Sequence, residues 1–266
     1  MQLRHDPTFF WATGRLPAAV RPAVHAVYGF VRYADELVDG PRRPPTPALR
    51  RAALDGWERA LDRARAGDAA AAPAPVPPVI RALVDAERRH GLPLAELHVY
   101  MDPMRVDCGR VRISSADELA RYMDGSAAAV GRVLAPLLGC DAPDDMARIG
   151  VAFQLTNFIR DVREDWALDR VYLPGLPEAD LARGRSGEEA RARVAEQVSA
   201  ARALFAATAD VPERCDRAVR SGMRLARAVY GRVLDRCETL GYDVLGGRTA
   251  LRPWQLAAAA AGGLRG

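Results

Sequence analysis

The sequence predicts an all-α fold, and three observations support this prediction. Apolar residues recur along most of the chain with the three- and four-residue spacing of amphipathic helices. No segment shows the sustained alternation of a strand, and no Asn-Gly pair suggests a hairpin. Proline-rich segments separate the helical stretches. We expect helices over residues 17–39, 48–66, 78–91, 93–102, 115–138, 143–166, 187–208 and 212–241.

The breaks between these helices do not divide the chain into domains. Residues 40–47 (GPRRPPTP) end the first long helix, and residues 67–78 (GDAAAAPAPVPP) read as a flexible surface loop. A third break covers residues 174–187. No tandem repeat is evident among the 266 residues. We therefore expect one helical domain, residues 1–266, that is large enough to enclose a cavity.

The composition is that of a globular protein and argues against nucleic-acid binding. Hydrophobic residues make up 49% and charged residues 27% of the chain, with a net charge of +4. No dense basic run is interleaved with aromatic residues, as a nucleic-acid partner would require. Every basic residue is arginine, whose planar and permanently charged group suits phosphate oxygens.

Cysteine, histidine and hydropathy patterns indicate neither a zinc site nor a membrane span. The four cysteines form no CxxC pair, and the four histidines lack metal-ligand spacing. No apolar run reaches the roughly 20 residues that cross a bilayer. The first six residues have no signal-peptide layout. We expect a cytoplasmic monomer or weak dimer, with peripheral contact to the inner membrane face for product release.

The first informative segment is residues 28–39, YGFVRYADELVD. On a helix its polar stripe has intervals of four, three and four residues, within roughly 60° of arc. The stripe consists of Tyr28, Arg32, Asp35 and Asp39. Two like charges on one helix face cost stability, and the apolar flanking residues raise that cost. A bound cation would relieve both penalties.

The second informative segment, residues 154–165 (QLTNFIRDVRED), repeats this geometry. Its stripe has intervals of three, four and four residues, within roughly 80° of arc. The stripe consists of Gln154, Asn157, Asp161 and Asp165. Polar groups along an otherwise apolar helix are expensive unless they have partners.

A plain structural explanation competes with a functional one. Carboxylates four residues apart are common on solvated helix faces, where Arg32, Arg160 and Arg163 can form ordinary surface ion pairs. Two features favour a site: both pairs lie on apolar helices, and the two stripes have the same length and sense. We therefore expect the stripes to face each other across a cleft.

Opposed carboxylate pairs suit one kind of chemistry. Mg²⁺ takes oxygen ligands and is typically held by one or two carboxylates plus substrate phosphate oxygens. A cluster of such ions over a diphosphate would neutralise the leaving group, so that an allylic C–O bond can ionise. An apolar cavity with aromatic walls would hold an isoprenoid tail and shield the carbocation from water.

The same segments resemble the phytoene and squalene synthase family. Residues 28–39 are similar to its first aspartate-rich motif, and residues 150–174 are similar to its second, including the Arg-x-Tyr-Leu-Pro end. Further similar segments are residues 6–28, 104–111, 122–131 and 242–248. The resemblance covers nearly the whole chain and is closest in style to actinobacterial phytoene synthases. It implies the isoprenoid synthase fold, a helical bundle around a central apolar cavity.

The resemblance also implies roles for individual residues. Metal ions would be held by Asp35, Asp39, Asn157, Asp161 and Asp165. Substrate contacts would come from Thr8, Phe9, Arg32, Tyr122, Gln154, Asn157, Arg160, Arg170, Tyr172 and Tyr242. Catalysis would rest on Tyr28, Arg32 and the four aspartates Asp35, Asp39, Asp161 and Asp165. The implied apolar wall is Val130, Gly131, Leu134 and Phe153, although sequence alone cannot distinguish wall residues or tyrosines from ordinary core.

The implied reaction is a Mg²⁺-dependent, head-to-head condensation of two allylic diphosphates through a cyclopropyl diphosphate. Two geranylgeranyl diphosphates would give phytoene by proton loss, a step of carotenoid biosynthesis. Two farnesyl diphosphates would give a squalene-type product, and only then would NADPH be needed. Two or three Mg²⁺ ions are implied, with Mn²⁺ as a substitute. The sequence identifies no general base, and bound diphosphate can serve as one.

Four positions depart from the family pattern. Glu36 replaces a second consecutive Asp but leaves the outer aspartate pair intact. Asp169 replaces the Gly that is common at its position. Ser126 and Ala128 stand where many relatives carry Val and Gly, so tail length and product stay open.

Two other classes of protein use the same scaffold. A single-substrate terpene cyclase would use the same aspartates and would release a cyclised hydrocarbon from one diphosphate. An inactive relative that acts as an assembly scaffold would show no Mg²⁺-dependent diphosphate binding. The presence of all four aspartates argues against the scaffold.

Overall fold

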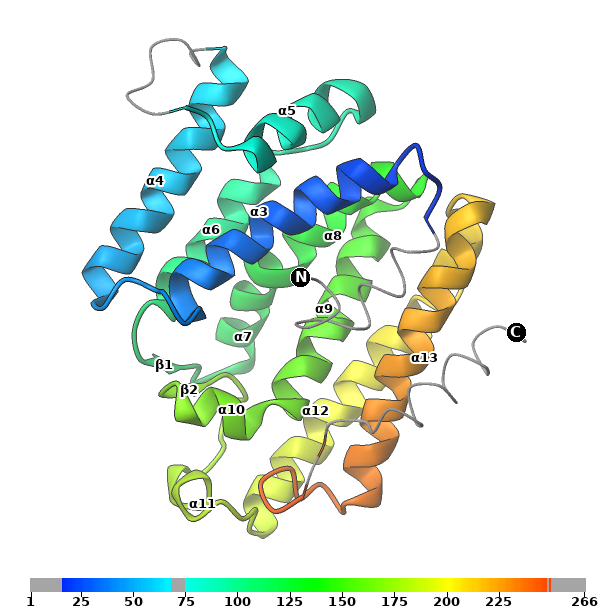
Figure 1. Cartoon of the computed structure of the whole chain (residues 1–266). Coiled ribbons are helices and arrows are strands. Elements are labelled where there is room, and N and C mark those ends of the chain that lie inside the picture. The colour runs from blue at the N-terminus through cyan, green and yellow to red at the C-terminus, as the bar shows by residue number, and fades with distance from the viewer. Residues whose placement is uncertain (1–15, 68–74, 248, 250–266) are drawn as a thin grey trace.

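The computed structural model describes residues 16–67, 75–247 and 249. Within these ranges the chain folds into helices joined by turns, so the all-α prediction is confirmed (Figure 1). The longer helices are α3 (Arg21–Asp39), α4 (Pro47–Ala66), α5 (Pro78–His90), α6 (Glu96–Asp107), α9 (Pro143–Arg160), α12 (Glu188–Ala207) and α13 (Arg217–Thr239). The shorter ones are α7 (Ala116–Met123), α8 (Ala129–Leu134), α10 (Val162–Ala167) and α11 (Glu178–Arg183). No helix in the described ranges is both long and apolar enough to cross a membrane.

Local sequence signals explain where several helices begin and end. The Thr46 hydroxyl accepts a hydrogen bond from the Leu49 N–H at 3.3 Å, which caps the first turn of α4. The same helix ends at Gly67, whose φ of 83° lies in the left-handed region that glycine adopts without steric cost. Ser115 caps α7 by accepting a hydrogen bond from the Glu118 N–H at 3.2 Å. These caps satisfy backbone groups that the helices themselves leave unpaired.

Helix α9 runs through the middle of the described structure and contributes to two hydrophobic cores (Figure 1). The first core lies among α3, α4, α5, α6 and α8, and includes the fully buried Phe30, Leu83 and Met101. The second lies among α7, α10, α11, α12 and α13, and includes Ile159 and Leu234. Helix α9 packs against both α8 and α12. A polar stripe on α9 therefore lies where the two cores meet.

A short parallel sheet, which the sequence did not predict, joins the segments that follow α6 and α10. Strand β1 (Val111–Arg112) pairs with β2 (Arg170–Val171), with Val111 opposite Arg170. The Val111 N–H donates to the Asp169 carbonyl at 3.2 Å. Strands of two residues are too short to give a detectable alternation in sequence.

The helix predicted over residues 143–166 is interrupted and becomes α9 and α10. Asp161 leaves helical geometry, with φ −103° and ψ 16°. The Asp161 N–H nevertheless donates to the Asn157 carbonyl at 2.8 Å, and the Asp165 N–H donates to the Asp161 carbonyl at 2.8 Å. The four-residue repeat thus continues through the break and keeps the polar stripe together.

The helix predicted over residues 115–138 divides into α7, a π-helical turn (Asp124–Ala128), α8 and a 3₁₀ turn (Pro136–Leu138). The π turn packs closely on α6, because a Cβ on Gly125 would lie 2.6 Å from the Val99 carbonyl oxygen. Proline has no N–H, so the α-helix ends where the 3₁₀ turn begins. Single π turns in helical segments often mark functional sites.

Helices α8 and α9 pack closely at Gly131. A Cβ on this glycine would lie 2.5 Å from the Met146 carbonyl oxygen and 2.9 Å from the Ala147 Cα. Both neighbours are backbone atoms, so a larger residue would push the helices apart. A Cβ on Gly231 of α13, in contrast, would meet nothing within 4 Å.

We expect Gly131→Ala to lower the free energy of unfolding by about 1–3 kcal/mol, because it overpacks the contact between α8 and α9. The matched control is Gly231→Ala, which should raise this free energy by about 0.5–1 kcal/mol by restricting the unfolded backbone. Urea denaturation followed by circular dichroism measures both changes. Equal effects of the two substitutions would contradict the close approach.

Candidate active site

One cavity in the described structure collects most of the residues that the sequence assigned to a site. It has a volume of about 430 Å³ and is lined by residues of α3, α6, α7, the π turn, α9, α10 and β2 and of the segments next to them. Its lining residues are Tyr28, Val31, Arg32, Asp35, Asp39, Tyr100, Met104, Asp107, Tyr122, Ser126, Gln154, Asn157, Phe158, Arg160, Asp161, Asp165, Arg170 and Tyr172. Five of these are aspartates and three are arginines, so the cavity carries more acidic than basic groups and favours a cation.

Two of the substrate-contact residues implied by the resemblance lie outside the described residues, and a third is described but does not line this cavity. Thr8 and Phe9 fall outside the described residues, so their roles stay predictions. Tyr242 follows α13 with a φ of 61° and packs against the second core. It does not line the described cavity, and its substrate contact also stays a prediction.

The four residues expected to form an apolar wall have packing partners on neighbouring helices and in the first core, and their role as a cavity wall stays a prediction. Phe153 stacks on Tyr230 of α13, with ring centroids 4.3 Å apart. Gly131 lies at the crossing of α8 and α9, and Val130 and Leu134 pack against the first core. None of these four wall residues lines the described cavity.

Helix α3 supplies the first carboxylate pair, Asp35 and Asp39. Arg32 donates a hydrogen bond to the Asp35 carboxylate, and its Nε lies 3.4 Å from Oε1 of Glu36. Glu36 itself does not line the cavity. Burial raises the pKa of Asp35, against the opposing effect of Arg32, and the charge of Asp39 raises it further. The Asp35 carboxylate therefore carries its negative charge at a cost that a nearby cation would reduce.

The second carboxylate pair lies at the junction of α9 and α10. Arg160 donates to both oxygens of Asp161, at 2.6 and 2.5 Å. Burial, together with the charge of Asp161, raises the pKa of Asp165 to about 8. The Oδ1 atom of Asn157 is buried and has no hydrogen-bond partner among the described residues. This side of the cavity thus presents crowded oxygen ligands, one of them unpaired.

Arg170 of β2 forms hydrogen bonds with residues of α3 and α6, so it connects three elements that line the cavity. Its guanidinium donates to both oxygens of Asp39, and the Nη1–Oδ2 distance is 2.8 Å. Nη2 also donates to the Asp107 carbonyl at 2.7 Å, and the side chain is only 5% exposed. Although burial acts to lower it, hydrogen bonding to Asp39 and the surrounding negative charges raise the pKa of Arg170. The group is therefore a permanent positive charge.

Asp107, at the end of α6, is a site residue that the sequence did not predict. Its carboxylate accepts hydrogen bonds from the hydroxyls of Tyr122 and Tyr172, the latter at 2.9 Å. Burial raises the pKa of Asp107 to about 6, although Arg170 and the two hydroxyls lower it. Burial, followed by the charge of Asp107, raises the pKa of both tyrosines well above its ordinary value. Both phenols therefore stay protonated.

One sequence signal could have identified Asp107. It follows the buried Tyr100 and Met104 by seven and three residues on α6, so it continues an apolar helix face. A charged residue at such a position is rarely buried without partners. Its partners, however, lie 15 and 65 residues away in the chain, so spacing alone could not reveal them.

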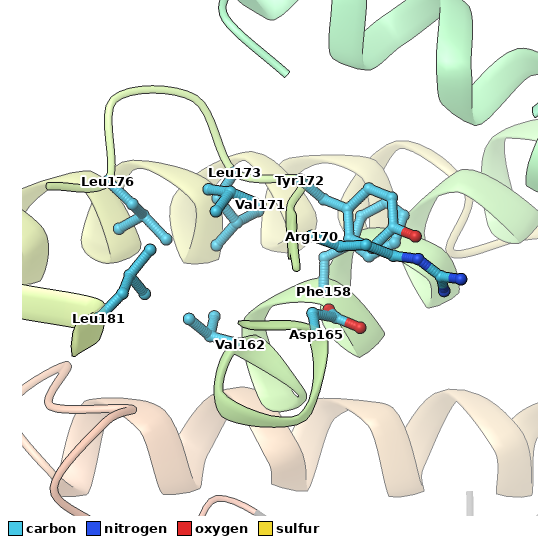
Figure 2. A pocket seen from close by; sticks show the side chains of 9 residues that line it. All are labelled: Phe158, Val162, Asp165, Arg170, Val171, Tyr172, Leu173, Leu176 and Leu181. Atoms are coloured by element: carbon cyan, nitrogen blue, oxygen red, sulfur yellow. The ribbon is translucent and has the colours of Figure 1, made fainter. Parts of the chain in front are cut away.

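A small void of about 10 Å³ lies behind the charged end of the cavity (Figure 2). Val162, Leu176 and Leu181 form its apolar end, while Asp165 and Arg170 direct their charged groups away from them. Such a volume is at the lower limit for one water molecule. The region is therefore apolar packing that supports β2 and α10, and not a ligand pocket.

The oxygen donors of the cavity fit a hard divalent cation. Among the described residues, no three acidic, histidine or cysteine side chains enclose an ion by themselves. Mg²⁺ does not require such a cage, because it keeps several waters and shares ligands with substrate phosphates. The unpaired Oδ1 of Asn157 and the crowded carboxylates of Asp35 and Asp165 fit such an ion.

The fold and the cavity define a class of protein: a helical bundle whose carboxylate pairs and three arginines line one cavity and suit a metal-bridged polyanion. Comparison with known proteins agrees with this class. The profile of the squalene/phytoene synthase family matches residues 3–255. The phytoene synthase of Thermus thermophilus is 33% identical over an alignment of 263 residues that covers 95% of this chain and 86% of that protein. The phytoene synthase of Arthrospira platensis is 31% identical over 275 residues, with the same coverage.

Solved structures show the same fold. A dehydrosqualene synthase in complex with a ligand has a TM-score of 0.85 at 23% identity, over 98% of this chain and 92% of that chain. A squalene synthase from Alicyclobacillus acidocaldarius has a TM-score of 0.79 at 26% identity, over 91% of both chains. The chain belongs to the squalene/phytoene synthase family, and the resemblance found in the sequence is confirmed.

We expect Asp107→Asn to flatten the pH dependence of stability of the metal-free protein. The folded-state pKa of about 6 exceeds the ordinary 3.8, so the folded protein binds this proton more tightly than the unfolded chain does. Stabilisation by this group is complete below about pH 4 and is lost as the pH rises through 6. The loss amounts to roughly 3 kcal/mol between pH 4 and 7. Urea denaturation at several pH values, with a chelator present, measures it.

The control for this experiment is Asp102→Asn on the same helix. The Asp102 side chain is 78% exposed and pairs with Arg105 at the surface. We expect this variant to keep the wild-type pH dependence. An unchanged pH dependence in Asp107→Asn would contradict a buried, proton-binding Asp107.

Proposed function

We propose that this protein condenses two geranylgeranyl diphosphates head to head, through a cyclopropyl diphosphate, to phytoene in carotenoid biosynthesis. One observation carries the proposal. Both aspartate pairs and three arginines line one cavity, in a chain 33% identical to a phytoene synthase. We take the whole chain, residues 1–266, as one catalytic domain.

The cavity arginines are the groups that receive the diphosphates in this proposal. A guanidinium fork matches phosphate oxygens with two parallel N–H donors. In the ligand-free protein each cavity arginine is already paired with a cavity aspartate. An incoming diphosphate competes for these forks and releases aspartate oxygens for a metal. The resting ion pairs thus hold both sets of groups close to their working positions.

Asp35, Asp39, Asn157, Asp161 and Asp165 are the residues that would hold Mg²⁺, with Mn²⁺ as a substitute. Bound Mg²⁺ would neutralise the diphosphate and promote cleavage of the allylic C–O bond. Burial and the charge of a neighbouring aspartate raise the pKa of Asp35 and of Asp165. A bound cation would offset the cost of these buried negative charges, so the two aspartates favour metal binding.

Aromatic rings face the space where carbocations would form. Tyr28, Tyr122 and Tyr172 line the cavity, and the Tyr172 ring stacks on Phe158 with centroids 4.2 Å apart. Aromatic faces attract cations without reacting as strong bases. Asp107 fixes the orientation of two of these rings through their hydroxyls. Because those phenols stay protonated, we assign the final proton to the released diphosphate, and phytoene then forms without NADPH.

Product analysis tests the proposal directly. Purified protein with Mg²⁺ and geranylgeranyl diphosphate, without NADPH, should form a forty-carbon hydrocarbon with a conjugated triene, identified by mass spectrometry and absorbance. Farnesyl diphosphate, with and without NADPH, is the parallel substrate. A thirty-carbon product from farnesyl diphosphate, with no product from geranylgeranyl diphosphate, would make the enzyme squalene-type. A cyclised product of one diphosphate would make it a terpene cyclase, and no product or diphosphate release from either substrate would contradict an active enzyme.

Replacing Asp161 or Asp165 by Ala should reduce turnover by about 100-fold or more, because each substitution removes a metal ligand. The melting temperature should stay near that of the wild type or rise, since like-charge repulsion is removed. Turnover assays and thermal melts measure the two effects. The control is Glu164→Ala, because Glu164 lies next to Asp165 in the chain and is exposed. This variant should retain activity. Full activity in Asp161→Ala or Asp165→Ala would exclude that residue from the mechanism.

A further inference from the structure

The turn between α10 and β2 has a strained conformation next to two cavity residues. Asp169 has a φ of 61°, in the left-handed region that costs a residue with a side chain about 1–2 kcal/mol. Its N–H donates to the Trp166 carbonyl at 2.9 Å, and the Leu168 N–H donates to the Asp165 carbonyl at 3.0 Å. Arg170 follows directly. The conformation of this one turn therefore sets the relative placement of Asp165 and Arg170.

Arg112 of β1 holds this turn from outside the cavity. Its Nη1 donates to the Asp169 carbonyl at 2.6 Å, and its Nη2 donates to the carboxylate of the same residue at 2.6 Å. Its Nε donates to Glu178 at 2.5 Å, and its guanidinium carbon lies 5.2 Å from the ring centroid of Trp166. One side chain thus contacts α10, the strained turn and α11.

Arg110 lies two residues earlier and provides an internal comparison. Its side chain is 60% exposed, whereas that of Arg112 is 24% exposed. Its Nε lies 3.8 Å from the Asp169 carboxylate, and its Nη2 lies 3.2 Å from Glu178. Exposed pairs of this kind contribute about 0–1 kcal/mol. Arg110 shares the acidic partners of Arg112, but among the described residues its guanidinium forms no hydrogen bond to the backbone of the turn and does not lie over the tryptophan ring.

We propose that Arg112 is a positioning residue for the diphosphate end of the cavity, because it fixes the left-handed turn at Asp169 and so places Arg170 and Asp165. Arg112 does not line the cavity, so it acts through these two residues. Its effect on substrate binding rests on the proposed function, whereas its effect on the turn does not. A displacement of about 1 Å at a binding group is enough to cost about 100-fold in rate.

Arg112→Met tests this role, because methionine keeps an apolar stem against Trp166 and removes the guanidinium. In metal-free protein, amides of residues 165–171 should exchange with deuterium about 10-fold faster than in the wild type. With Mg²⁺ present, inorganic diphosphate should raise the melting temperature of Arg112→Met by less than it raises that of the wild type. The KM for geranylgeranyl diphosphate should rise about 10-fold. Arg110→Met is the matched control and should match the wild type in all three measurements.

Arg112→Lys sharpens the test, because lysine keeps the charge but cannot donate to a carbonyl and a carboxylate as one planar fork. We expect it to behave like Arg112→Met. Unchanged exchange over residues 165–171 in Arg112→Met would overturn the proposal. Faster exchange with unchanged diphosphate stabilisation and KM would also overturn it, since the turn would then be irrelevant to binding. If the wild type neither binds diphosphate nor turns over, the proposed function fails, and the exchange measurement still decides whether Arg112 fixes the turn.

Discussion

The ion pair between Arg170 and Asp39 joins segments 131 residues apart in the chain, and the walls of the cavity depend on it. Removing two charges from water costs several kcal/mol, which attraction recovers only when geometry and further hydrogen bonds are good. Arg170 meets these conditions, because it donates to both oxygens of Asp39 and to the Asp107 carbonyl. One guanidinium therefore holds β2 against the ends of α3 and α6.

The hydrophobic cores support an arrangement that is costly by itself. The cavity gathers five carboxylates, an unpaired amide oxygen and a left-handed turn next to it. Each of these features costs free energy in the ligand-free protein. Helix α9 belongs to both cores, so its polar stripe is held from two directions. The packing of the two cores offsets the free-energy cost of these polar groups. The cavity can therefore keep an arrangement that is costly without ligands and suited to charged ligands.

Helical periodicity predicted the parts of the site that depend on spacing within one helix. The stripe on α3 is regular, and the stripe from Asn157 to Asp165 survives a helix break because its backbone hydrogen bonds keep the four-residue repeat. The side-chain partners of Asp107 lie 15 and 65 residues away in the chain, so spacing within α6 could mark this position as unusual but could not identify those partners. Phe153 shows the other limit, because an apolar residue that packs on a neighbouring helix and one that lines a cavity look alike in sequence, so its wall role stays a prediction.

The absence of lysine has a consequence for how the cavity responds to acid and base. The positive groups among its described lining residues are all guanidinium, and none of those lining residues is histidine. Guanidinium stays charged throughout the range in which proteins fold. Burial raises the pKa of Asp107 to about 6 and that of Asp165 to about 8, so these two lining carboxyls gain negative charge as the pH rises through the neutral range. Alkalinity can therefore only strengthen the attraction of this cavity for cations, and acidity can only weaken it.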